Sequence, residues 1–115
     1  MTIRRLKTYT GSQGYVYQYY FVGSRPSPTA DGTEYVFDVT SDRKTTYAVS
    51  VLLSREAVST WAHTHGRTLS DSEQYAAVKM CLFSAFDELD GPQHGRQLQV
   101  DEQFLEQSLA SLGVD

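Results

Sequence analysis

The 115-residue chain contains a single cysteine, Cys81, which excludes an internal disulfide framework. It has no apolar run that approaches the ~18 residues of a membrane span. The basic start, "MTIRRLKTYTG", is not followed by an apolar core of signal-peptide length. We therefore expect a soluble cytoplasmic protein with no membrane contact. Cys81 lies in the apolar run "VKMCLFSAF" and is expected to be a small buried hydrophobe, because a reactive thiol needs an electropositive, partly exposed setting.

Motifs of known catalytic chemistry are also missing. The chain has no GxSxG elbow, and "GSQG" joins two predicted strands instead of opening a helix, so it does not fit a phosphate-binding loop. His63 and His65 are two residues apart, which on a helix turns their rings ~200° away from each other. His94 lies in a separate loop. The sequence therefore identifies no catalytic residue, no cofactor and no metal site, and leaves any role of the three histidines open.

Charge is scarce and unevenly spread. The net charge is −4, made up of +3 over residues 1–67 and −7 over residues 68–115. Nucleic-acid binding through the first strand and a later turn is one functional hypothesis, with the basic residues Arg4, Arg5, Lys7, Arg43 and Lys44. The sequence pI near 5.2 disfavours it, because nucleic-acid-binding domains typically have a pI above about 9 or one clustered basic face.

The first half of the chain alternates between apolar and polar residues, which is typical of strands. We predict strands over 2–10, 15–23, 33–41 and 45–53. The segment 24–32, "SRPSPTADG", is predicted to be a loop, since it holds two prolines and a terminal Asp-Gly. Short polar turns between such runs predict an antiparallel meander.

The period changes to that of helices after Ser54. Ser54 is expected to cap a helix that stops at Gly66, and Ser70 with Glu73 has the spacing of a capping box for a helix over 70–89. Asp101 is expected to cap a last helix over 101–113. The sequence therefore predicts one α+β domain over 1–115: a four-stranded antiparallel β-meander in 1–53, followed by a helical part in 54–115 with three helices packed on one face of the sheet.

Apolar side chains exceed what one small sheet–helix layer can hide. In "GYVYQYYFVG" the face of Tyr15, Tyr17, Tyr19 and Phe21 is predicted to be core, which leaves the other face to be covered. The helix over 70–89 is apolar on more than one side, which is typical of a helix that is central to the fold or shared with another chain. We therefore expect a homodimer, the commonest closed assembly, with possible interface residues Val16, Tyr20, Val22, Met80 and Phe83.

These patterns favour a non-enzymatic, self-associating binding module whose protein or small-molecule partner the sequence does not identify. The alternative is a small-molecule-binding protein or enzyme with an aromatic pocket between sheet and helices. Its candidate lining residues are Tyr15, Tyr17, Tyr35, Tyr47 and Trp61.

Overall fold

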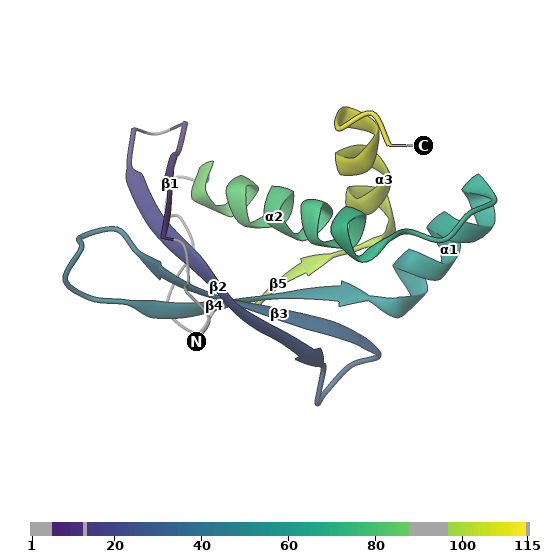
Figure 1. The fold of residues 1–115 in the computed structure, drawn as a ribbon, viewed down its shortest axis with the longest axis horizontal. Coiled ribbons are helices and arrows are strands. Elements are labelled where there is room, and N and C mark those ends of the chain that lie inside the picture. The colour runs from purple at the N-terminus through teal and green to yellow at the C-terminus, as the bar shows by residue number, and fades with distance from the viewer. Residues whose placement is uncertain (1–5, 13, 88–96, 115) are drawn as a thin grey trace.

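The computed structural model describes residues 6–12, 14–87 and 97–114, and these form one five-stranded sheet and three helices (Figure 1). The strands lie in chain order across the sheet, and the predicted α+β class with its four-stranded meander is confirmed. The bounds are β1 (Lys7–Thr10), β2 (Val16–Pro26), β3 (Gly32–Thr40), β4 (Tyr47–Ser54), α1 (Arg55–His65), α2 (Asp71–Asp87), β5 (Gln97–Val100) and α3 (Glu102–Ser111).

The fifth strand was not predicted, because the sequence indicated only helices after residue 53. β5 pairs in parallel with β4, with Ser50 opposite Gln97. Its "QLQV" alternates, since Leu98 and Val100 are buried while Gln97 and Gln99 are exposed. Four residues are too few for an alternating pattern to stand out in the sequence. A parallel partner also requires a long crossover connection, which α1 and α2 provide.

β2 runs further than predicted, through Pro26 instead of ending before Ser24. Among the described residues, β1 pairs with the first four residues of β2, and the later part of β2 pairs with β3. A proline is tolerated on a side of a strand that forms no ladder, because its missing N–H is not needed there. The register shifts between Phe21 and Gly23, which makes Val22 the extra residue of a β-bulge.

The core lies between one face of the sheet and α2, which runs across it (Figure 1). We call this the inner face. Its aromatic rings pack directly on α2: Tyr17 stacks on Phe86 at 4.5 Å between ring centroids, and Phe21 lies 5.1 Å from Tyr75. Tyr15 was predicted to join this face, but it precedes β2 and its side chain is 58% exposed.

Local hydrogen bonds fix the beginnings of the helices as predicted. The Ser54 hydroxyl accepts the N–H of Ala57, and the Asp101 carboxylate accepts the N–H of Phe104. At α2, Ser70 and Glu73 form the reciprocal capping box, each side chain accepting the other residue's N–H. Because Ser54 is both the last residue of β4 and the cap of α1, the chain passes from sheet to helix without a loop.

Candidate binding surfaces

Of the five aromatic residues predicted to line a pocket, four belong to the core cluster or pack against it, and Tyr15 does not. Tyr17 and Tyr35 are buried on the inner face, Tyr47 is half-buried at the start of β4, and Tyr15 is exposed. Trp61 is buried in α1, where its ring stacks on His65 at 4.2 Å. Burial raises the pKa of the Tyr17, Tyr35 and Tyr47 hydroxyls, so they are neutral at physiological pH. Tyr17 and Trp61 therefore act as packing residues in this fold.

The histidine contact described in α1 is structural. The Nε2 atom of His65 lies 2.7 Å from a carboxylate oxygen of Glu106, so this residue joins α1 to α3. His63 is exposed, and His94 lies outside the described residues. Within the part of the chain that the structure describes, no group of three or more His, Cys, Asp or Glu side chains is placed to hold a metal ion.

The described basic residues of the nucleic-acid hypothesis belong to two segments of the chain. Lys7 lies on β1, whereas Arg43 and Lys44 lie in the turn between β3 and β4. In that turn the Asp42 carboxylate accepts the backbone N–H groups of Lys44 and Thr45, each at 2.8 Å. These bonds lower the pKa of Asp42, so a negative charge sits beside the two cations. Arg4 and Arg5 fall outside the described residues.

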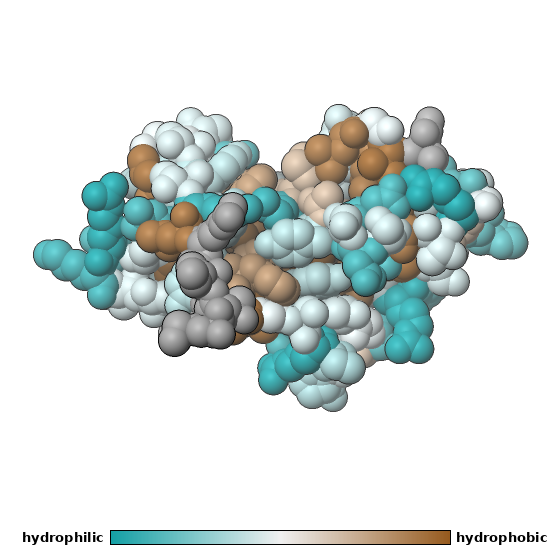
Figure 2. Space-filling model, viewed as in Figure 1, coloured by the Kyte–Doolittle hydropathy of each residue, from teal (hydrophilic) through white to brown (hydrophobic). Residues whose placement is uncertain are grey.

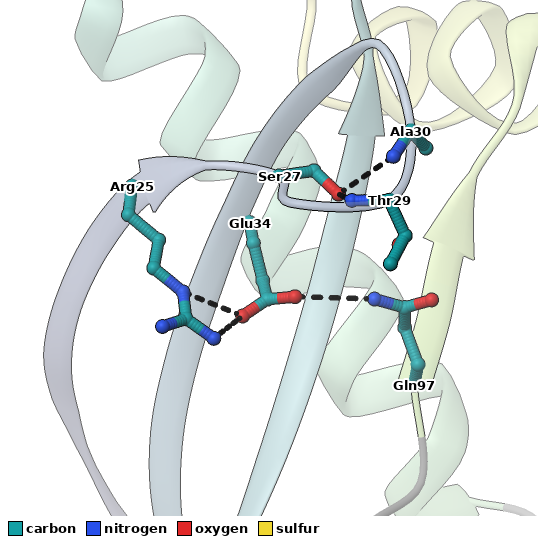
Figure 3. Close-up of polar contacts among 6 residues, drawn as sticks. All are labelled: Arg25, Ser27, Thr29, Ala30, Glu34 and Gln97. Carbon is teal, nitrogen blue, oxygen red and sulfur yellow. Dashed lines mark hydrogen bonds and ion pairs between the residues drawn. The ribbon is translucent and has the colours of Figure 1, made fainter.

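A buried carboxylate lies on the outer face of the sheet, the face turned away from α2. Glu34 is only 7% exposed and stands directly opposite Arg25 across β2 and β3. Arg25 donates to one carboxylate oxygen from Nε at 3.0 Å and from Nη2 at 2.8 Å. Gln97 donates to the other oxygen at 3.2 Å, reaching across β4 from β5 (Figure 3). Each oxygen is thus paired, which is the condition for keeping a buried charge.

The sequence alone does not reveal this Arg25–Glu34–Gln97 cluster. Arg25 and Glu34 are nine residues apart, and only the hairpin register brings them together. The hairpin end is held by Ser27, whose hydroxyl accepts the backbone N–H groups of Thr29 and Ala30 (Figure 3). The cluster stabilises the register of three strands, and this structural role accounts for its contacts.

A shallow hollow of about 380 Å³ adjoins the cluster at the β-bulge. It is lined by Val22, Gly23, Ser24, Arg25 and Val36. Of the predicted interface residues, Val22 is 38% exposed here and Val16 is 43% exposed further along β2. Tyr20 lies on the same outer face, where its hydroxyl donates to Asp38 at 2.8 Å. These three residues therefore belong to one surface.

The other two predicted interface residues lie on the opposite side of the molecule, in a groove along α2 that we call the α2 groove. Two adjoining hollows of about 320 and 270 Å³ share Met80 and Phe83 as their floor. Tyr9 of β1 stands on one side, stacked on Phe83 at 4.5 Å, and Phe104 and Leu112 of α3 stand on the other. Figure 2 shows the notch between the hairpin end of the sheet and α3, with apolar side chains on both sides.

Opposite charges flank the α2 groove. The Lys79 ammonium lies 5.7 Å from the ring centroids of both Tyr75 and Phe83. Burial, with Lys7 nearby, lowers the pKa of Lys79. At the end of α2, the Asp87 carboxylate accepts the Tyr9 hydroxyl at 3.0 Å and the Ser12 N–H at 2.9 Å. The groove therefore combines an apolar floor with one cation and one anion at defined places.

Comparison with protein-family models, curated proteins and solved structures finds no match for this chain. None of the described helices is both long enough and apolar enough to cross a bilayer. Cys81 is buried as predicted, and its sulfur lies 3.8 Å from the backbone oxygen of Gln99 in β5. The described surface therefore offers two apolar areas, the outer-face hollow at the β-bulge and the α2 groove.

Proposed function

We propose that this protein is a non-enzymatic, self-associating binding module that acts in the cytoplasm as a homodimer. The observation that carries the proposal is the second apolar side of α2. The helix already buries six side chains on its inner side: Ala77, Val78, Cys81, Leu82, Ala85 and Phe86. A helix on the surface of a monomer needs only one such stripe, yet Ala76 and Met80 extend the apolar surface of α2 beyond it, next to Phe83, whose ring packs on Tyr9 and Tyr19.

The position of this second apolar side supports a role in association. Met80 and Phe83 are half-buried at the floor of a groove, not scattered singly over the surface. Apolar side chains that gather in a partly open groove mark sites where proteins or ligands bind. The alternatives, an aromatic ligand pocket and a nucleic-acid surface, stay predictions from the sequence, because no geometry described above favours either one.

Sedimentation equilibrium over a wide range of protein concentrations tests the proposal. We expect a mass of twice 12.9 kDa that dissociates at low concentration. Met80→Glu is expected to shift the equilibrium towards monomer, because it places two charges in the apolar contact. Ser59→Glu, on the exposed side of α1, is the matched control and leaves the mass unchanged. A mass of one chain at the highest concentration reached would overturn the proposal.

A further inference from the structure

Building on the binding role proposed above, though not on self-association, we propose that the α2 groove binds an amphipathic anion. The ligand is an apolar molecule that carries one acidic group, a carboxylate or a phosphate. Its acidic group lies between Lys7 and Lys79, and its apolar body lies over Met80 and Phe83 on the floor of the groove.

Two lysines from distant segments come together beside the groove. Tyr9 of β1 stacks on Phe83 of α2 at 4.5 Å between ring centroids. Lys7 precedes Tyr9 by two residues and lies on the same side of its strand. Lys79 precedes Phe83 by four residues, about one helical turn. Burial and the nearby Lys7 ammonium both lower the pKa of Lys79, so the fold holds two positive charges close together at this point.

No described carboxylate balances these two cations. Among residues 6–12, 14–87 and 97–114, each ion pair involves an arginine or a histidine, and neither lysine takes part. Lys79 is half-buried, so its charge is only partly hydrated. An opposite charge placed between two like charges favours the charged form of both. The site therefore attracts the acidic group of a ligand.

The rest of the groove suits an apolar body. The hollow beside Lys79 measures about 270 Å³ and has Met80, Phe83 and Leu112 in its lining. The adjoining hollow of about 320 Å³ adds Phe104. Ligand pockets typically measure about 300–1,000 Å³ and combine apolar walls with a few polar groups that fix the orientation of the ligand. A slender apolar chain can therefore lie along the recessed floor, in the notch that Figure 2 shows.

The charge at the far end of the groove determines which way the ligand lies. Asp87 follows Lys79 by eight residues, about 12 Å along the helix. Its carboxylate is held by the Tyr9 hydroxyl at 3.0 Å and the Ser12 N–H at 2.9 Å, and it stands at the negative end of the α2 dipole. This end repels an acidic group. The acidic group therefore binds at Lys79, and the apolar body extends from there towards Phe104.

An amide-resolved NMR titration with three octyl compounds tests the charge preference. Octanoate, octanol and octyltrimethylammonium share one alkyl chain and differ in charge. We expect octanoate to shift the amides of Lys79 and Met80, octanol to bind about tenfold more weakly, and the cation to cause no shift. Octyl phosphate is titrated beside octanoate, and the tighter of the two identifies the acidic group. Equal affinities for octanoate and octanol would overturn the proposal.

Charge-removing variants locate the acidic group. Lys79→Met and Lys7→Met are each expected to weaken octanoate binding about tenfold, because each removes one of its two cations. Binding of octanol should not change, which shows that the groove itself is intact. Lys44→Met, in the exposed turn after β3, removes the same charge away from the groove and is the matched control. Octanoate affinities that are unchanged in both groove variants would contradict the assignment.

A variant in the apolar wall gives a second, independent test. Leu112→Asp places a carboxylate beside the acidic group of the ligand and is expected to weaken octanoate binding at least about tenfold. Val16→Asp, at a similarly exposed apolar residue on the outer face of the sheet, is the control and should bind as wild type does. Circular dichroism confirms that each variant is folded.

The outcomes separate the ligand from self-association. The titrations use a protein concentration at which sedimentation shows single chains, so that a second copy does not cover the groove. Octanoate shifts confined to the hollow at Val22, or binding to phosphatidylglycerol vesicles without binding to octanoate or octyl phosphate, overturn the site. A protein that forms dimers but binds neither octyl anion overturns the ligand alone. A protein that binds octanoate and stays a single chain at every concentration overturns self-association alone.

Discussion

The two faces of the sheet are built from the same strands but with different chemistry. On the inner face Phe37, Val49 and Val51 are completely buried against the helices. On the outer face the contacts are polar pairs between neighbouring strands, such as Tyr20 with Asp38 and Arg25 with Glu34. The inner face contributes most of the free energy of folding, since that free energy comes chiefly from apolar burial. The outer face determines which residues stand opposite each other.

The two faces should differ most in the free energy of unfolding that is lost when a side chain is truncated. Phe37→Ala should reduce the free energy of unfolding by about 3–5 kcal/mol, because it opens a cavity in a closed core. Val16 of β2 is 43% exposed. Val16→Ala should therefore reduce the free energy of unfolding by less than about 1 kcal/mol. Urea unfolding of the two variants measures both values. A large cost at Val16 that grows with protein concentration would contradict this contrast and would show that the outer face is covered in the dimer.

A smaller effect is expected where the hairpin approaches α2. A Cβ atom added at Gly11 would lie 2.5 Å from the carbonyl oxygen of Phe86. Gly11→Ala should therefore cost about 1–3 kcal/mol, as other forced close contacts do. Gly23→Ala, in the outer-face bulge with nothing within 4 Å, is the matched control. Equal unfolding free energies for the two variants would mean that the hairpin does not rest on α2 as described.

Removing a contact of the Arg25–Glu34–Gln97 cluster should reduce the free energy of unfolding less than Phe37→Ala or Gly11→Ala does. Arg25→Met leaves the Glu34 carboxylate with Gln97 as its described side-chain partner. Because Arg25 is 64% exposed and its pairing is partly screened, we expect a loss of about 1 kcal/mol. A double-mutant cycle with Glu34→Gln isolates the interaction between the two side chains. Additive losses in that cycle would show that they do not interact.

The smallest expected effect on stability comes from the capping box of α2, which lies outside the sheet. This effect depends on pH. Hydrogen bonds from the Arg67 guanidinium and the Ser70 N–H lower the pKa of Glu73 from 4.5 to about 2. A carboxyl group with a lower pKa in the folded state stabilises the fold above pH 4.5, and this contribution is lost as the pH falls towards 2.

Unfolding free energies measured between pH 6 and pH 2 test this dependence against the variant Glu73→Gln. Wild type should be the more stable at pH 6, and the two curves should approach each other near pH 2. Glutamine can still accept the Ser70 N–H, so the comparison isolates the charge. Parallel curves over the whole range would contradict the assignment.

The sequence predicts the inner face well and the connections between distant segments poorly. Alternation in β3 and β4 places Phe37, Val49 and Val51 on one side, because the side-chain period of a strand is a local property. The start of α2 at Ser70 and Glu73 is equally local. The pairing of Glu34 with Gln97 depends instead on β5 lying parallel to β4, and no local period encodes which strand is its neighbour.

For the candidate surfaces too, the sequence predicts local features and misses contacts between distant segments. Both apolar sides of α2 are visible in the sequence, and Met80 and Phe83 were predicted as interface residues for that reason. The walls of the groove were not predicted, because Tyr9 and Leu112 reach it only through the packing of β1 and α3 on α2. The aromatic pocket stays a prediction, since period two assigns each residue to a side of its strand but does not identify the partner across the layer.

The parallel strand β5 also has a consequence for the order in which the chain folds. The hairpins of β1 to β4 join residues that are close in sequence, whereas Ser50 and its partner Gln97 are 47 positions apart. Contacts with such a separation form slowly, because the entropy of closing the loop is lost before the pairing is gained. Refolding should therefore begin in the meander, with β5 adding last, after α2 has docked. During synthesis, the β4 edge of the sheet would therefore stay uncovered until β5 has formed.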